Sequence, residues 1–205
     1  MNTSSLCKRM LAIIISLMFV LFMPGCHYIE LLTAHDEEIY ECTNVDEYGT
    51  FVGNFDNTFP QEFIASFFPE TISTDFSNVV YSYRAMRWDD YRFEAYLEFH
   101  IEDKNAYRSY ISAICDEAQW ADFGFDKKYR EYIISDEYEL DVYKDEEFVD
   151  YAKIGKILCC DEDQTVIYIA LASPRCCPYN PEYFQTFFNR FDISPMEYAQ
   201  ALKQT

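Results

Sequence analysis

The most regular alternation of apolar and polar residues lies between residues 78 and 101. Apolar side chains occupy every second position at Phe93, Ala95, Leu97, Phe99 and Ile101. A similar series precedes Asp89-Asp90, at Val79, Tyr81, Tyr83 and Ala85. A period of two is typical of a half-buried strand, so the two series predict a hairpin. We expect an odd-length loop that places Tyr83 opposite Leu97 and Arg84 opposite Tyr96, because a shift of one residue would exchange the two faces.

A second hairpin is predicted over residues 152–173, with its turn at residues 161–164. Residues 166–171 are apolar on both faces. This pattern indicates an interior strand that is covered on both sides, or on one side by a partner. Tyr138, Leu140 and Val142 alternate with polar residues and predict a further strand, and we expect the acidic residues 145–147 to form a solvated turn.

Helix starts are marked by capping residues and prolines. A first helix is predicted from Phe59-Pro60 until Pro69, and a second from Asp103 until about Trp120. Two more helices close the chain. One begins at Asn180-Pro181, and the other at the capping box of residues 194–197. Together these elements predict an α+β domain, in which an antiparallel sheet built from two hairpins carries helices packed on one face.

The first 26 residues have the organisation of a bacterial export signal. Lys8-Arg9 are followed by an apolar run from Met10 to Met23, which is short for a membrane span of about 20 residues. The end of this segment resembles the lipobox of bacterial lipoproteins. A small residue, Gly25, precedes Cys26, and Met23 holds the position where that family has an aliphatic residue. Pro24 departs from the usual pattern.

This resemblance implies cleavage before Cys26, a lipid on the Cys26 sulfur and acylation of the new amino terminus. Two or more acyl chains give a stable membrane anchor. We therefore expect residues 1–25 to be a signal peptide, residues 26–50 to be the lipid anchor and the segment that leads into the domain, and residues 51–205 to be one globular domain. The expected location is the extracytoplasmic face of the cell membrane. The alternative is an uncleaved apolar helix extended towards Leu32, which would have to accommodate Glu30.

The chain is strongly acidic, with 36 acidic and 16 basic residues and a formal charge of −20. Residues 1–25 hold two of the basic residues and no acidic one, so the charge becomes −22 after cleavage. Such a domain repels nucleic acid, whose affinity for proteins comes largely from Lys and Arg on phosphates. The acidity serves solubility or, alternatively, the recognition of a basic protein or another envelope partner. Beyond the covalent lipid on Cys26, we expect no cofactor.

Eight cysteines are present, of which Cys7 would leave with the signal peptide. With Cys26 lipidated, six remain: Cys42, Cys115, Cys159, Cys160, Cys176 and Cys177. An even number in an exported chain permits disulfides. Buried free thiols and a thiolate metal site are the alternatives, although the usual C-x-x-C spacing of such a site is missing. Adjacent residues of a strand point to opposite faces, so a bridge within either adjacent pair would be strained.

No motif for catalysis stands out. The G-x-S-x-G elbow, H-E-x-x-H and Gly-rich phosphate loops are absent from the sequence. His100 lies on the polar face of a predicted strand, where a surface role is the simpler interpretation. Residues 161–172 lack the Gly and Glu that a calcium loop needs at its sixth and twelfth positions, so we expect no metal there.

The aromatic content is more informative, since 18 residues are tyrosines. Tyr combines an apolar ring with a polar tip and is common on recognition surfaces. Tyr81, Tyr83 and Tyr96 are candidates for an aromatic binding surface, and packing within the sheet is the alternative. The sequence therefore predicts a membrane-anchored binding or interaction module without enzymatic activity. A hydrolase that acts on envelope carbohydrate or peptide through carboxylates is the alternative.

Overall fold

The computed structural model describes residues 39–49, 59–86, 89–143, 146–173 and 185–203. Residues from Ile39 onward form one compact unit. This unit begins earlier than the predicted boundary at residue 51, because β1 (Ile39–Cys42) pairs with β2 (Phe76–Met86) and Tyr48 is buried. The apolar residues at 39–40 therefore belong to the edge of the sheet.

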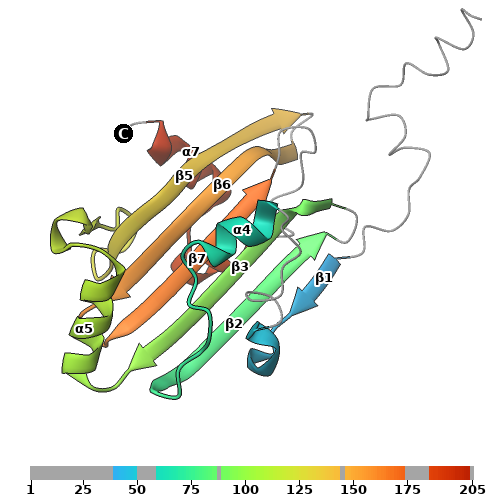
Figure 1. Cartoon of the computed structure of the whole chain (residues 1–205). Coiled ribbons are helices and arrows are strands. Elements are labelled where there is room, and N and C mark those ends of the chain that lie inside the picture. The colour runs from blue at the N-terminus through green and yellow to red at the C-terminus, as the bar shows by residue number, and fades with distance from the viewer. Residues whose placement is uncertain (1–38, 50–58, 87–88, 144–145, 174–184, 204–205) are drawn as a thin grey trace, which may run out of the picture. The chain divides into compact units, whose positions relative to one another are not determined.

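The centre of the unit is one antiparallel sheet of seven strands in the order β1-β2-β3-β7-β6-β5-β4 (Figure 1). The remaining strands are β3 (Asp89–Ile101), β4 (Ala121–Asp122), β5 (Arg130–Tyr143), β6 (Glu146–Cys160) and β7 (Thr165–Ser173). The predicted α+β class is confirmed. The sheet holds more than the two predicted hairpins. The pairing of β3 with β7 joins these two, and β5 and β6 form a third hairpin that extends the sheet beyond β6.

The predicted β6–β7 hairpin is confirmed, with Cys160 paired to Thr165 around the turn at residues 161–164. Gln164 adopts a left-handed conformation with φ of 59°, which helps a short loop to reverse the chain. In the β2–β3 hairpin, Tyr83 lies opposite Ala95 and Arg84 opposite Glu94. The predicted pairing is therefore wrong by two residues. It kept each side chain on its correct face, because a shift by two preserves the alternation.

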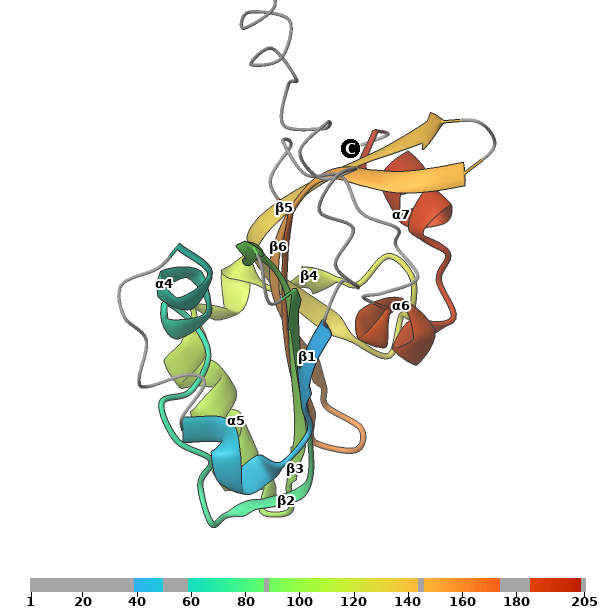
Figure 2. The ribbon, with the colours of Figure 1, turned by 90° about the vertical axis from the view of Figure 1, so that its right-hand side faces the viewer.

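Helices cover both faces of the sheet, and the prediction of helices on one face is wrong in this respect (Figure 2). On one face lie α4 (Phe59–Ala65) and α5 (Lys104–Ile114), and on the other lie α6 (Thr186–Phe191) and α7 (Pro195–Leu202). The physical reason is visible in β7, where all nine residues are buried. A strand that is apolar on both faces needs a cover on both.

Two hydrophobic cores result, one on each face. The core under α4 and α5 includes Phe63, Ile64, Leu97, Phe99, Tyr107, Ile111 and Tyr168. The core under α6 and α7 includes Ile154, Leu158, Ile167, Ile169, Phe187, Phe188 and Tyr198. The two cores share the sheet backbone, so each central strand contributes alternate residues to each of them.

The helix caps follow the sequence signals closely. The Asp103 carboxylate accepts a hydrogen bond of 2.7 Å from the Ala106 backbone N–H and caps α5. Ser194 and Glu197 form the predicted capping box of α7. Helix α5 ends at Ile114 and not near Trp120, because Cys115 is fully extended and Asp116 begins a separate 3₁₀ turn at Glu117–Gln119. The predicted helix start at Asn180-Pro181 lies outside the described residues.

Candidate functional site

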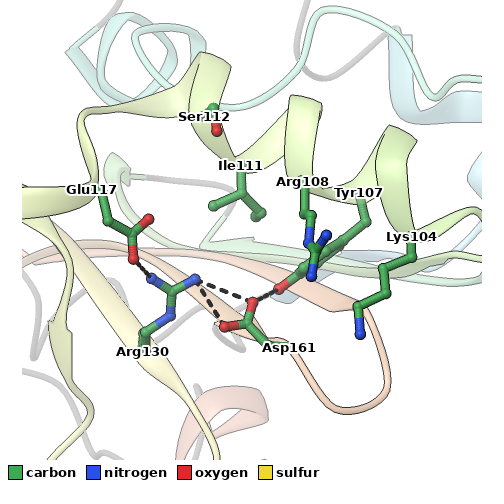
Figure 3. Close-up of a pocket in the computed structure, with 8 residues that line it drawn as sticks. All are labelled: Lys104, Tyr107, Arg108, Ile111, Ser112, Glu117, Arg130 and Asp161. Atoms are coloured by element: carbon green, nitrogen blue, oxygen red, sulfur yellow. Dashed lines mark hydrogen bonds and ion pairs between the residues drawn. The ribbon is translucent and has the colours of Figure 1, made fainter.

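A pocket of about 360 Å³ opens beside α5, between this helix and one end of β5 and β6 (Figure 3). We call it the α5 pocket. It is lined by Lys104, Tyr107, Arg108, Ile111, Ser112, Glu117, Arg130 and Asp161. Its volume lies at the lower end of the range of about 300–1,000 Å³ that is common for small-molecule sites.

The residues of the α5 pocket come from separate segments of the chain. The helix supplies the first five, the following 3₁₀ turn supplies Glu117, strand β5 supplies Arg130, and the β6–β7 turn supplies Asp161. The pairing of Arg130 with Cys159 in the sheet places Arg130 beside that turn. The lining is therefore fixed by the sheet register and by the packing of α5, and not by a flexible loop alone.

Arg130 is the centre of a charged network in this pocket. Its guanidinium binds Glu117 through Nη1 and Asp161 through Nη2, the latter at 3.1 Å (Figure 3). The Tyr107 hydroxyl donates to Asp161 Oδ1 at 2.9 Å. The Arg130 guanidinium also lies 5.5 Å from the centre of the Trp120 ring, within reach of a cation–π interaction.

The electrostatics of Arg130 keep it charged. Burial alone would lower the pKa of Arg130, but the nearby acidic groups of Cys159, Asp161 and Glu117 outweigh this effect and raise it. Glu117 and Asp161 remain largely solvated, with side chains 80% and 61% exposed. Exposed ion pairs contribute little to stability, so this network is better suited to position groups than to hold the fold together.

Lys104 and Arg108 lie on one side of the α5 pocket and are exposed. Within the described residues, neither side chain has a hydrogen-bond or ion-pair partner. They are four residues apart on α5 and therefore lie on the same face of the helix. The sequence already shows these two cations at helical spacing in a strongly acidic chain. The other half of the pocket depends on contacts that only the fold creates.

The predicted aromatic surface is not formed by the residues proposed for it. Tyr81, Tyr83 and Tyr96 are buried, with 3%, 8% and 2% of their surfaces exposed. Tyr81 and Tyr83 belong to the core under α4 and α5, whereas Tyr96 faces α6 and donates its hydroxyl hydrogen to Glu98. The alternative of core packing is correct for these three rings, because their strands are covered on both faces.

Four of the six candidate disulfide cysteines lie in the described residues, and Cys42, Cys115, Cys159 and Cys160 all carry free thiols. Cys159 and Cys160 point into opposite cores, as their adjacent positions on a strand require. Burial raises the pKa of the Cys159 thiol to about 11, although Arg130 and Tyr107 act in the opposite direction. Cys176, Cys177 and the candidate lipidation site Cys26 lie outside the described residues.

The described part of the chain contains no group of three or more His, Cys, Asp or Glu side chains placed to hold a metal ion. In the same residues, no helix is long and apolar enough to cross a membrane. His100 is half-buried on β3, at the pair with Thr165 beside the β6–β7 turn. Among the described residues, the α5 pocket is therefore the best candidate for a functional site, because charged and polar side chains line it.

Comparison with family models, with curated proteins and with solved structures finds no match to this chain. The function must therefore be argued from the residues of the site.

Proposed function

We propose that this chain is a lipid-anchored binding module on the extracytoplasmic face of a bacterial membrane, and that the α5 pocket is its recognition site. The observation that carries the proposal is the arrangement of that pocket, in which charged groups from helix, turn and strand surround one open volume. The anchor part of the proposal is supported by the lipobox-like residues Gly25-Cys26.

A binding role fits the chemistry of the pocket better than acid–base catalysis. Both of its carboxylates, Glu117 and Asp161, bind the same guanidinium. Their oxygens are therefore engaged within the pocket and are less available to a substrate as an acid or a base. The Tyr107 hydroxyl already donates to Asp161, so it too is occupied. The cations Lys104 and Arg108 remain available to a ligand or to an envelope partner.

Anchoring is tested by metabolic labelling with a fatty-acid analogue. The wild type and Cys7→Ala should be labelled and should sediment with membranes, whereas Cys26→Ala should be unlabelled. Cys7→Ala is a matched control because Cys7 lies within the segment that cleavage would remove. Equal labelling of Cys26→Ala would contradict the anchor.

The recognition site is tested by photocrosslinking in cells, with a photoreactive residue in place of Ser112 in the pocket. The control carries the same residue in place of Asn189, which is exposed on α6 on the opposite face of the sheet. We expect a crosslinked product of defined mass, heavier than the protein alone, from position 112 but not from position 189. Identical patterns from both positions would contradict a binding role of the pocket.

A further inference from the structure

We propose that the α5 pocket binds a phosphate group. This proposal rests on the proposed binding role of the pocket and adds the chemical class of the ligand. Two features support it: the unpaired cations of the pocket, and their position on α5.

The first feature is the charge balance inside the pocket. The lining holds three cations, Lys104, Arg108 and Arg130, and two carboxylates. Both carboxylates bind Arg130, so the two cations of the helix are left without an internal counter-charge among the described residues. By contrast, the buried Lys156 binds Asp136 and the exposed Arg190 binds Glu98. The lining as a whole carries a net charge of +1, and Lys104 and Arg108 form its positive side, where an anionic ligand group would bind.

The second feature is the position of the two cations in the helix. Lys104 is the first residue of α5, and the first turn of this helix contains no acidic residue. The helix dipole disfavours cations at an N-terminus and favours anions there. A chain with 36 acidic residues thus places an unpaired lysine in the first turn of a helix, where it costs stability, and an unpaired arginine one turn later. A bound anion would remove this cost.

The geometry suits a phosphate. Lys104 and Arg108 side chains project from the same face of α5, and Figure 3 shows their charged ends on the same side of the helix as Tyr107 and Asp161. An Arg can contact two oxygens of a phosphate while a Lys contacts the third as a point charge. The Ser112 hydroxyl, one turn further along, is a further donor in the lining.

The test is calorimetric titration of the purified full-length chain, in nonionic micelles, with inorganic phosphate and with phenyl phosphate. We expect saturable binding that weakens with added salt. Lys104→Gln and Arg108→Gln should each weaken it by about fivefold or more, as expected for loss of a charge-assisted hydrogen bond. The control Lys203→Gln removes the same charge at the C-terminal end of α7 and should bind like the wild type.

Glu117→Gln gives a test in the opposite direction. The Gln side chain removes a negative charge from the rim and weakens the contact with one nitrogen of Arg130, since a neutral amide oxygen accepts a weaker hydrogen bond than a carboxylate. Phosphate should then bind more tightly, by about twofold or more, since one exposed charge pair is worth up to about 1 kcal/mol. Absence of saturable phosphate binding by the wild type, or equal weakening by Lys203→Gln, would overturn the proposal.

The source of the phosphate is resolved by doping the micelles with phosphatidate. If phosphatidate competes with phenyl phosphate for the wild type but not for Arg108→Gln, the bound phosphate belongs to a lipid headgroup. Phenyl phosphate binding that phosphatidate does not affect would assign a soluble ligand. If position 112 captures a partner in cells while phosphate does not bind, the binding role stands and the phosphate assignment fails. If phosphate binds and no adduct forms, the phosphate assignment stands, and the result argues against a macromolecular partner at position 112.

Discussion

Lys156 Nζ lies 2.6 Å from Asp136 Oδ2, although Lys156 is only 3% exposed. The same ammonium binds Glu131 Oε2 at 2.9 Å and lies 5.3 Å from the centre of the Tyr198 ring. The Tyr198 hydroxyl in turn donates to Asp136. Strands β5 and β6 and helix α7 are thus joined by one buried charged network, on the face of the sheet opposite the α5 pocket.

Removal of this cation should destabilise the domain. In Lys156→Met the carboxylates of Asp136 and Glu131 lose their partner in a largely buried place, which costs about 3 kcal/mol or more. Urea unfolding followed by circular dichroism should show a lower midpoint with an unchanged slope. Lys203→Met, an exposed change just after the end of α7, is the control and should have almost no effect. Equal midpoints for Lys156→Met and wild type would contradict the proposed role of the network.

Glu94 is buried, with 1% of its surface exposed, and binds the first turn of α6 from the sheet. Its carboxylate accepts hydrogen bonds of 3.0 Å from the Thr186 hydroxyl and from the Phe187 N–H. Burial raises the pKa of Glu94 above its ordinary value of 4.5, despite these hydrogen bonds. A raised pKa in the folded state contributes stability at pH values below 4.5, which is lost as the pH rises through the folded-state pKa.

As the pH rises, the free energy of unfolding of the wild type should therefore fall relative to that of Glu94→Gln. Glu98→Gln is an informative control on the same strand. Burial would raise the pKa of Glu98, but hydrogen bonds from Arg190 and Tyr96 outweigh it and lower the pKa. For Glu98 the stability that the carboxylate contributes to the wild type is lost as the pH falls. The free energy of unfolding of the wild type should therefore fall relative to that of Glu98→Gln as the pH falls. Urea midpoints at several pH values measure both, and parallel curves would refute the assignment.

Sequence periodicity predicted the central strands well, because burial on alternate sides leaves a strong pattern. Arg84 was expected on the polar face of its hairpin, and it lies there opposite Glu94. The exact pairing could not be predicted, since β2 and β3 contain register shifts beside Met86 and between Ser77 and Val80. Such irregularities depend on tertiary packing and leave no periodic signal.

The third hairpin and the α5 pocket were both missed, for different reasons. Residues 145–147 are acidic and were predicted as a turn, yet Glu146 and Glu147 pair with Tyr143 and Val142 at the start of β6. The β5–β6 hairpin was missed for this reason. The pocket was missed with it, because Arg130 and Asp161 are distant in sequence and meet only when β5 pairs with β6. Local patterns cannot report contacts over such a separation.

Gly155 on β6 provides a close approach between the sheet and α4. A Cβ atom at this position would lie 2.7 Å from Phe63 Cζ and 3.3 Å from Phe67 Cε1. Gly155→Ala should therefore displace α4 and lower the free energy of unfolding by about 1–3 kcal/mol, as overpacking of a core does. Gly124→Ala, where a Cβ meets no atom within 4 Å, is the matched control. Phe63→Leu should partly restore stability in the Gly155→Ala background, and destabilisation equal to that of Gly124→Ala would contradict the contact.

The cysteines should differ strongly in reactivity. Cys115 is half-buried at the end of α5, whereas Cys159 and Cys160 are fully buried. Burial also raises the pKa of Cys159 to about 11, against an ordinary value of 9.0. The thiolate is the reactive form, so its fraction at neutral pH falls by about a hundredfold relative to an ordinary thiol. A short pulse of maleimide on the native chain, followed by peptide mass spectrometry, should modify Cys115 well before the other two.

The same labelling tests the free state of these thiols in cells. After unfolding in urea without a reductant, Cys42, Cys115, Cys159 and Cys160 should all react, because each carries a free thiol in the structure. A residue that reacts only after reduction would be part of a disulfide that the described residues do not contain. Since Cys159 and Cys160 face opposite cores, a bridge at either would have to reach a partner elsewhere in the chain, and the labelled peptides would identify it.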